Sequence, residues 1–335
     1  MDNITLIIPC YNEQENIPEF YKQIKGVEIP DCQISCLFID DGSQDSTREI
    51  LQELSSRDSR ISYISFSRNF GKEAAMLAGL DYAEGDAVVI MDADLQHPID
   101  KLPLMVEYWR QGYDDVCGRR VDRADESWAK RNFTNLFYYC YQKVSRYPLQ
   151  RNVGDFRLLD KRCVAAIRLM RETQRYTKGI YTWIGYKKKE FPYEVLPRFA
   201  GKSTWSFMAL LKLAVEGIIS FSTVPLKIAS ILGLAVSGLA LLYMMYIFIT
   251  VLIYGDPVAG YPTIMVTLLL LGGIQLLSLG IIGEYLGKIF GESKDRPLYL
   301  VDEYNGEKFI YSPASVCRER AGRLAAKEHS NGSFK

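Results

Sequence analysis

The chain has 335 residues, of which 48% are hydrophobic, and its 40 basic side chains balance its 40 acidic ones. A formal net charge of zero gives no general attraction to nucleic acid, and this length is typical of one large domain or two smaller ones. The seven cysteines are odd in number and no two have CxxC spacing. This pattern favours free thiols in a reducing compartment over a disulfide framework or a zinc site.

The first hundred residues alternate between short apolar runs and segments with helical spacing. The apolar runs predict strands at 4–9, 34–40, 61–67 and 86–94, and the segments between them predict helices at 13–26, 45–57 and 71–85. This order predicts an α/β fold with a mostly parallel sheet. In such sheets, ligands bind beyond the carboxyl ends of the strands.

Polar residues collect at the ends of these four predicted strands, in the order PCYNE, DDGS, SRNFGK and DADLQ. Because parallel strands end at one edge, the four segments are expected to form one polar rim. The chain has no GxGxxG after the first strand and no GxxxxGK[ST]. Those absences argue against a dinucleotide-binding dehydrogenase and a P-loop phosphate site.

Two carboxylates, Asp92 and Asp94, stand one residue apart after the apolar run AVVI, and Gln96 is one step further. In an extended segment, alternate residues face the same side. Two like charges so close repel each other unless a cation separates them. Mg²⁺ and Mn²⁺ prefer carboxylate oxygens and keep positions open for phosphates. The stretch therefore predicts a clamp for a metal ion and a diphosphate; the alternative is a solvated turn.

From about residue 102 the pattern is less regular. It predicts a strand at 114–120, an aromatic helix at 128–144, a glycine-containing loop at 197–205 and an apolar helix at 205–225. We expect the last of these to lie in a membrane interface, although an ordinary amphipathic docking helix has the same pattern.

Two long runs without any charge follow, at 228–255 and 257–283. Each exceeds the roughly 20 apolar residues needed to span a bilayer as a helix, so we predict a transmembrane hairpin. The alternative is a pair of buried helices in a soluble protein. Basic residues flank the hairpin at Lys227, Lys288, Lys294 and Arg296 and are absent from its connection. The positive-inside rule therefore predicts that both ends are cytoplasmic.

The N-terminal segment MDNITLIIPCYNE has no basic region before its short apolar run, so we expect no signal peptide. We divide the chain into a cytosolic catalytic domain (1–200), interfacial amphipathic helices (201–226), two transmembrane helices (227–284) and a cytoplasmic C-terminal tail (285–335). The expected location is the inner (plasma) membrane as a multi-pass protein with both termini in the cytoplasm.

The ordered motifs PCYNE, IDDGSQDST, RNFGKEAAMLAGL and MDADLQHP resemble glycosyltransferase family 2, whose catalytic domain has the GT-A fold. The later motifs GDFRLLD, RFAGKSTW, FSTVPLK and RPLYLV, together with the hairpin, resemble the polyprenyl-phosphate glycosyltransferases within that family. This group includes bactoprenol glucosyltransferases and, as a more distant likeness, dolichyl-phosphate mannose synthase. The resemblance covers residues 4–302.

The resemblance implies a role for each matching position. Asp155 and Asp94 would act in catalysis. The nucleotide-sugar site would comprise Pro9, Tyr11, Glu13, Asp40, Asp41 and Asp92. Mg²⁺ or Mn²⁺ would bind to Asp92, Asp94 and Gln96. The acceptor phosphate would be bound by Arg120, Arg131, Arg198, Lys202 and Ser203. His97 departs from the pattern, since the family more often carries Asp or Asn there. We expect a harmless change beside the site; if His97 faced the metal, the assignment of Gln96 would be in doubt.

The implied reaction is inverting transfer of a sugar from a nucleotide-diphospho-sugar, with UDP-glucose favoured, to undecaprenyl phosphate at the cytoplasmic face of the membrane. The attacking phosphate oxygen is already anionic, so Asp155 would orient groups as much as remove a proton. A separate flippase would move the product, because the two spans carry no charged residue. A small-xxx-small pattern from Gly233 to Ser237 would permit homo-oligomers.

Three alternatives remain at this point. One is an inactive nucleotide-sugar-binding membrane protein, which would be expected to lose rim residues that this chain keeps. Another is a processive polysaccharide synthase, which would carry QxxRW where this chain has QRYTKG at 174–179. The third is a transferase that acts on a different lipid or on a hydroxyl acceptor.

Overall fold

The computed structural model describes residues 1–121, 152–173, 175–196 and 260–311, with isolated positions between 233 and 253. The chain divides into two compact units, of which one comprises 1–142, 147–206 and 297–335 and the other 143–146 and 207–296. Four predicted segments lie wholly or mostly outside the described residues: the aromatic helix at 128–144, the loop at 197–205, the helix at 205–225 and the span at 228–255.

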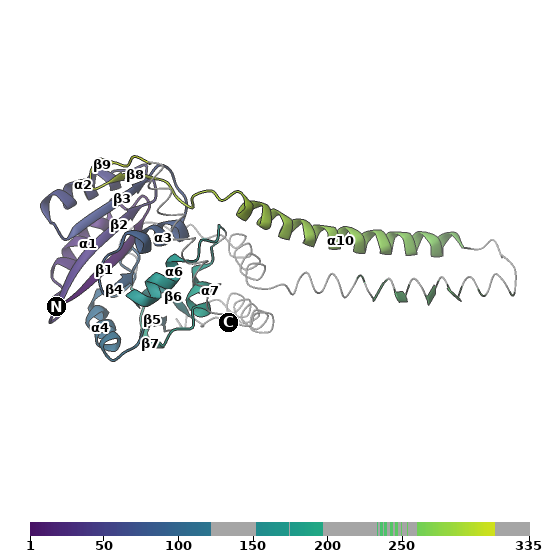
Figure 1. The fold of residues 1–335 in the computed structure, drawn as a ribbon, viewed down its shortest axis with the longest axis horizontal. Helices are drawn as coiled ribbons and strands as arrows, with labels where there is room; N and C mark the ends of the chain where they lie inside the picture. The colour runs from purple at the N-terminus through teal and green to yellow at the C-terminus, as the bar shows by residue number, and fades with distance from the viewer. Residues whose placement is uncertain are drawn as a thin grey trace, which may run out of the picture. The chain divides into compact units, whose positions relative to one another are not determined.

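A nine-stranded sheet in the order β7-β5-β6-β4-β1-β2-β3-β8-β9 forms the centre of the first unit (Figure 1). Its strands are β1 (Asp2–Cys10), β2 (Cys32–Asp40), β3 (Ile61–Phe66), β4 (Ala87–Ile90), β5 (Asp115–Arg120), β6 (Val153–Asp160), β7 (Lys188–Tyr193), β8 (Val301–Tyr304) and β9 (Glu307–Lys308). The first four are parallel, as the sequence predicts. The predicted strand at 114–120 is present as β5.

The predicted helices of the first hundred residues are present as α1 (Asn16–Lys25), α2 (Thr47–Arg57) and α3 (Lys72–Tyr82). The other described helices of this unit are η1 (Ile99–Lys101), α4 (Leu102–Arg110), α6 (Lys161–Arg168) and α7 (Thr177–Trp183). Two helix layers cover the sheet, because each strand of the centre carries apolar side chains on both faces.

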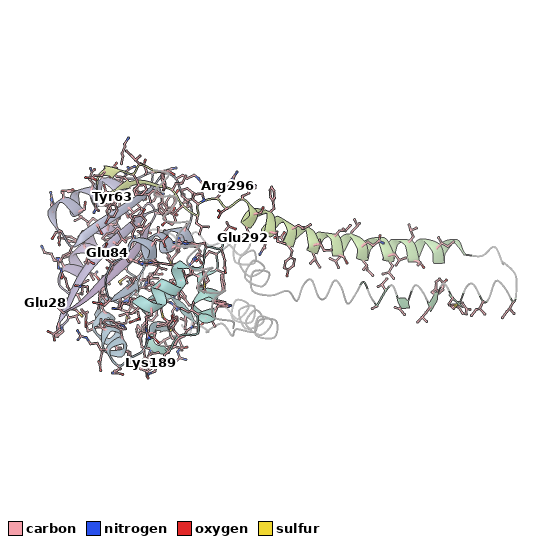
Figure 2. The ribbon with its side chains drawn as sticks, viewed as in Figure 1. Glu28, Tyr63, Glu84, Lys189, Glu292 and Arg296 are labelled. Atoms are coloured by element: carbon pink, nitrogen blue, oxygen red, sulfur yellow. The ribbon has the colours of Figure 1, made fainter. Side chains whose placement is uncertain are left out.

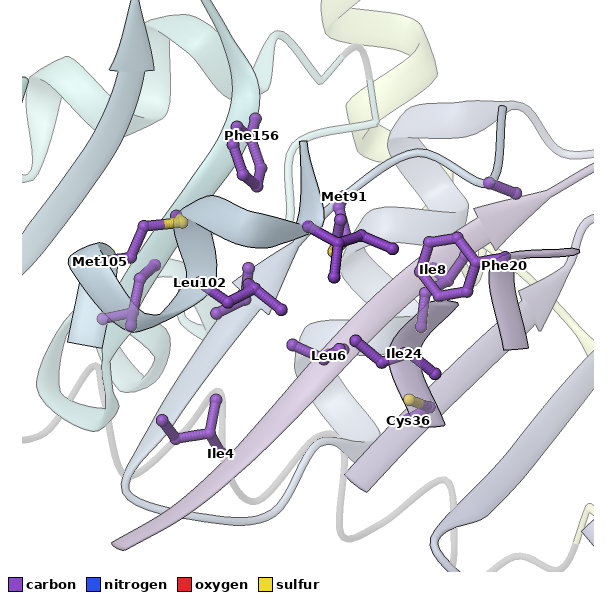
Figure 3. Close-up of a cluster of buried hydrophobic side chains, with 14 of the residues drawn as sticks. Ile4, Leu6, Ile8, Phe20, Ile24, Cys36, Met91, Leu102, Met105 and Phe156 are labelled. Carbon is purple, nitrogen blue, oxygen red and sulfur yellow. The ribbon is translucent and has the colours of Figure 1, made fainter. Parts of the chain in front are cut away.

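The side chains of β1 show how the two layers pack. Ile4, Leu6 and Ile8 join one apolar cluster with Phe20 of α1 and side chains of α4 (Figure 3). Ile7 points to the other face, where α3 approaches so closely that a Cβ on Gly79 would lie 2.2 Å from Ile7 Cγ2. A glycine at this position therefore sets the distance between α3 and the sheet.

Two features of the sheet differ from the sequence expectation. β4 ends at Ile90, so Asp92 and Asp94 follow the strand instead of lying within a strand that runs to 94. In addition, β6 lies between β4 and β5 and runs antiparallel to both. The run GDFRLLD contains no turn signal and no helical period, but its pairing partners are distant in sequence and could not be deduced from the run itself.

The C-terminal strand β8 pairs antiparallel with β3 and covers that edge of the sheet. Polar side chains fix this pairing: Arg48 binds Asp302 at 2.8 Å and also contacts Glu303. Nearby, the ring of Tyr299 stacks on Phe66 with 5.1 Å between centroids, and its hydroxyl donates to Asp81 at 2.7 Å. Residues 297–311 thus contribute to the first unit.

In the second unit, α10 (Tyr261–Ser293) is a single helix of 33 residues. Within the described part of the chain, the stretch from Leu270 to Ser293 is the one helix long and apolar enough to cross a membrane. The large apolar side chains that the structure describes on this helix, between Ile264 and Phe290, are mostly exposed (Figure 2). The helix continues ten residues beyond the predicted limit of the span at 283, and no proline lies between that limit and Pro297.

Candidate active site

The carboxyl ends of β1, β2, β3 and β4 form one rim of the sheet, as the sequence predicts. The chain winds from β1 through β2 to β3 in one direction, and β4 lies on the other side of β1. This reversal of strand order next to β1 is the switch point where open α/β sheets bind ligands. Pro9 is buried at the end of β1, beyond the last pairing with β4.

The loops that follow β1 and β2 are tied together by reciprocal hydrogen bonds. The backbone N–H of Asn12 donates to Ser43 Oγ at 2.9 Å, and the Asn12 side-chain oxygen accepts the N–H of Gln44 at 2.8 Å. The Glu13 N–H donates to Thr47 Oγ1 at 2.8 Å, while the Glu13 carboxylate accepts the side-chain amide of Asn16. The neighbouring Tyr11 is exposed at this rim.

Asp40 and Asp41 at the end of β2 are buried and bind the adjacent loops. Asp40 accepts the N–H of Ser43 at 2.9 Å and the hydroxyl of Ser65 at 2.6 Å. Asp41 accepts the N–H groups of Phe70 at 2.6 Å and Gly71 at 2.9 Å. Burial raises the pKa of Asp41, although these two hydrogen bonds oppose the rise. Contact of either residue with a nucleotide base stays a prediction.

The loop fixed by Asp41 leads directly into α3, whose first residue, Lys72, reaches across the rim. Its ammonium lies 2.6 Å from Asp92 Oδ1 and 3.2 Å from Asp155 Oδ2. Burial alone lowers the pKa of Lys72, but these two carboxylates raise it above its ordinary value. Lys72 is therefore a cation that bridges two acids from separate strands.

Asp92, Asp94 and Gln96 alternate with buried residues and are themselves half-exposed, in a turn beyond the end of β4; that their side chains face one side stays a prediction. Between them, Leu95 adopts φ 60, a left-handed conformation that is unusual for a bulky residue and marks local strain. The Gln96 N–H donates to Asp94 Oδ1 at 3.2 Å, and the Gln96 carbonyl accepts the N–H of Leu196 at 3.2 Å. These bonds hold the turn.

His97 is buried beneath this turn and its ring stacks on Phe156. Its Nδ1 accepts the backbone N–H of Asp92 at 3.0 Å, so in the neutral ring the proton is on Nε2. Burial lowers the pKa of His97 and favours this neutral form. Neither nitrogen then offers a lone pair to a metal, and His97 supports the Asp92 backbone instead.

Asp155 reaches the rim from β6. Arg157 of β6 pairs with Ile90 of β4, so continuing this antiparallel register places Asp155 across from Asp92. Burial raises the pKa of Asp155, but the charge of Lys72 and of more distant cations outweighs it, and the net pKa lies well below its usual range. Asp155 is consequently an anion that binds a proton weakly.

A buried ion pair below Asp155 anchors β6. The Arg157 guanidinium lies 2.9 and 3.2 Å from the two carboxylate oxygens of Asp115 on β5, and both side chains are almost fully buried. The same guanidinium donates to the carbonyl of Gly154 at 3.1 Å and lies 3.6 Å above the ring of Tyr181. These contacts fix the backbone immediately before Asp155.

Arg120 ends β5 on the same side. Its Nε donates to the hydroxyl of Tyr193 at 3.1 Å, and a Cβ placed on Gly154 would lie 3.9 Å from its guanidinium. Burial lowers the pKa of Arg120, but Tyr193, Asp92 and Asp155 raise it overall. The structure therefore brings Arg120 next to the acids of the rim. Arg131, Arg198, Lys202 and Ser203 lie outside the described residues.

The donor set at the rim suits a hard divalent cation. Two half-exposed carboxylates, Asp92 and Asp94, follow β4 one residue apart, and carboxylate oxygens are the ligands that Mg²⁺ and Mn²⁺ prefer. Over the described ranges, no three His, Cys, Asp or Glu side chains converge on one point. The fit thus rests on two aspartates, with water or substrate oxygens as the other ligands. Coordination by Gln96 stays a prediction.

Comparisons with known proteins agree with this architecture. The family profile described as glycosyl transferase family 2 matches residues 5–168, and a second profile, described as the GtrB C-terminal hairpin, matches residues 224–289. The bactoprenol glucosyl transferase of Shigella phage SfV is 42% identical over 299 residues, which is 89% of this chain and 97% of that protein. The chain belongs to glycosyltransferase family 2.

Further relatives of this glycosyltransferase have similar names. The prophage bactoprenol glucosyl transferase homolog of Escherichia coli K12 is 41% identical and aligns with 89% of this chain and 98% of that one. Among solved structures, the mannosyltransferase PcManGT from Pyrobaculum calidifontis, in complex with GDP-Man and Mn²⁺, aligns with a TM-score of 0.43 at 17% identity, covering 86% and 87% of the two chains. The sheet of this glycosyltransferase is an α/β sheet whose first four strands are parallel.

Sequence reasoning missed two features of this rim. Lys72 was not among the predicted site residues, whereas it bridges Asp92 and Asp155. The available signal was its position, directly after Gly71 at the start of a helix that follows a rim strand. The Arg157–Asp115 pair joins residues far apart in the chain, and no local pattern in the sequence indicates it.

Proposed function

We propose that this glycosyltransferase transfers a sugar from a nucleotide-diphospho-sugar, UDP-glucose, to a polyprenyl phosphate, undecaprenyl phosphate, at the cytoplasmic face of the membrane. The observation that carries the proposal is its 42% identity to a bactoprenol glucosyl transferase across 97% of that protein's length. The likeness includes both the catalytic rim and the apolar segment that contains α10, which suits a lipid acceptor.

Residues of different charge on the rim would bind different parts of the substrates. The loops after β1 and β2, with Pro9, Tyr11, Glu13, Asp40 and Asp41, would form the nucleotide side of the site. A divalent cation bound to Asp92 and Asp94 would offset the charge that develops on the departing nucleoside diphosphate. Arg120 lies on the same rim as these acids. The donor diphosphate would therefore bind to the metal ion on Asp92 and Asp94, while the acceptor phosphate would bind to Arg120 close by.

The acceptor side is basic. Guanidinium groups bind phosphate oxygens through paired hydrogen bonds, which makes Arg120 the described candidate for the lipid phosphate. Arg131, Arg198, Lys202 and Ser203 belong to the same proposal through the family resemblance. Binding the phosphate here would place one of its oxygens against the anomeric carbon of the sugar.

Asp155 would orient groups in this reaction and would not need to accept a proton. A phosphate monoester carries about 1.5 to 2 negative charges at pH 7, so its oxygen attacks without deprotonation. The lowered pKa of Asp155 also makes it a weak base. A single displacement inverts the anomeric centre and gives a β-linked polyprenyl monophosphate sugar, which a separate flippase would have to carry across the membrane.

The test is incubation of the purified full-length chain with radiolabelled nucleotide sugars and undecaprenyl phosphate, with Mn²⁺ or with EDTA. We expect one labelled lipid, formed from UDP-glucose, that disappears in EDTA and in Asp94→Asn. Asp100→Asn is the matched control, because Asp100 lies a few residues after Asp94, is exposed and is paired with the adjacent Lys101. Equal turnover in EDTA would refute the metal role, and label transferred only to soluble hydroxyl acceptors would refute the lipid role.

A further inference from the structure

Lys72 is held in place by the surrounding fold. Gly71 precedes it with φ 97, and the Gly71 N–H is bound by the buried Asp41. The helix that Lys72 begins is set against the sheet by the close approach of Gly79 to Ile7. The side chain of Lys72 is nevertheless 44% exposed, although its ammonium is held between two carboxylates.

The ammonium of Lys72 already neutralises one member of the acidic pair. It lies 2.6 Å from Asp92 Oδ1, a distance typical of a strong charge-assisted hydrogen bond. A divalent cation that binds Asp92 must approach this resident positive charge, and the two cations repel each other at short range. Without a substrate, the charge of Lys72 therefore opposes metal binding, and a site made of Asp92 and Asp94 without Lys72 would not have this electrostatic cost.

We propose that Lys72 is a positioning residue that occupies Asp92 in the absence of substrate and thereby makes tight binding of the divalent cation depend on the nucleotide diphosphate. This inference rests on the proposed function, because it assumes a nucleotide-diphospho-sugar donor. The diphosphate supplies negative charge and further oxygen ligands, which is how Mg²⁺ is commonly held in nucleotide enzymes. It also offers the ammonium an anion in place of Asp92.

The chemistry of lysine suits this role better than that of arginine. An ammonium on a flexible stem is a point charge that can turn from a carboxylate to a phosphate oxygen, whereas a guanidinium prefers a fixed, two-pronged geometry. Lys72 also contacts Asp155 Oδ2 at 3.2 Å. This second contact would hold Asp155 in position while Asp92 exchanges the ammonium for the metal ion. By linkage, the metal must favour the nucleotide by the same factor that the nucleotide favours the metal.

The experiment measures Mn²⁺ binding to the full-length chain in detergent, from the electron paramagnetic resonance signal of free Mn²⁺, with and without UDP. In the wild-type chain we expect UDP to tighten Mn²⁺ binding by about 30-fold or more, within the usual range of coupling between sites. Lys72→Met should tighten Mn²⁺ binding without UDP by about 10-fold, because the competing charge is gone, and should shrink the effect of UDP to about 3-fold.

Two further variants define the mechanism. Lys101→Met is the matched control, since Lys101 is similarly exposed and paired with Asp100, and it should behave as the wild type. In an Asp92→Asn background, Lys72→Met should no longer tighten Mn²⁺ binding, because the contested carboxylate is absent. This comparison stays informative if Lys72→Met is less stable, and Lys72→Arg should retain part of the coupling.

Several results would overturn the inference. They are weaker Mn²⁺ binding in Lys72→Met without UDP, an unchanged effect of UDP in that variant, or tightening that persists in the Asp92→Asn background. A wild-type chain that binds UDP but no Mn²⁺ would refute both this inference and the metal role in the proposed function. A chain that shows the coupling but glycosylates no polyprenyl phosphate would refute only the acceptor.

Discussion

Replacing Asp115 by alanine should destabilise the catalytic unit more than any surface substitution. The change leaves the guanidinium of Arg157 without its carboxylate, and the charge stays buried because that side chain is only 2% exposed. Removing one partner of a buried ion pair costs about 3–5 kcal/mol. For a domain of this size, about 2–4 °C is lost per kcal/mol, so the melting temperature should fall by on the order of 10 °C.

The assay is thermal unfolding of the detergent-solubilised chain at one fixed heating rate, followed by intrinsic fluorescence. The matched comparison is Asp115→Leu combined with Arg157→Met, which removes both charges and keeps apolar volume. A buried pair replaced in this way is often neutral in stability, so the double variant should recover most of the loss. A double variant as unstable as Asp115→Ala would refute the argument that the unpaired charge is the cause.

The same variants should separate stability from activity. Arg157 donates to the carbonyl of Gly154, immediately before Asp155. Even where the double variant is stable, the segment that carries Asp155 loses this bond, so transfer should stay well below that of the wild type. Full activity in the double variant would show that the Arg157 bond to Gly154 does not position Asp155.

Two other predictions concern stability away from the rim. The pKa of Asp58 is lowered chiefly by hydrogen bonds from Arg60, so its contribution is present above its unfolded pKa of about 3.9 and is lost as the pH falls towards the lower folded pKa. Asp58→Asn should therefore lower the free energy of unfolding at pH 7 by about 1 kcal/mol, and the melting temperature with it. The difference in melting temperature between wild type and variant should shrink below about pH 4. A difference that stays constant with pH would contradict the role of the Asp58 charge. Gly79→Ala should cost about 1–3 kcal/mol by forcing its Cβ against Ile7, whereas Gly272→Ala, which meets open space, should change the melting temperature little.

The sequence predicts the inner part of this fold well because the signals there are local. Each of the first four strands is a short apolar run followed by polar residues, and each intervening helix has its own spacing. Parallel order then brings the ends of these strands to one rim without any further information. The alternation of Asp92 and Asp94 was also predictable, since it requires only a short extended turn.

The remainder depends on pairing between distant segments. The insertion of β6 between β4 and β5 places Asp155 opposite Asp92, but no periodicity in GDFRLLD indicates its neighbours. The contact of Lys72 with Asp155 follows from that insertion and was not predictable, although the position of Lys72 at the start of α3 already places it near the rim. His97 is similar: the sequence alone did not decide whether it faces the metal, whereas hydrogen bonding and burial assign it to the support of the turn.

Strand β8 also has a consequence for the order of synthesis. It is encoded after α10, yet it completes the sheet beside β3. A nascent chain on the ribosome must consequently leave this outer strand edge unpaired until the whole apolar segment has emerged. Exposed strand edges recruit other chains, so the newly made N-terminal half is open to misassembly during that interval. A shorter delay between the synthesis of β3 and that of β8 would reduce this exposure.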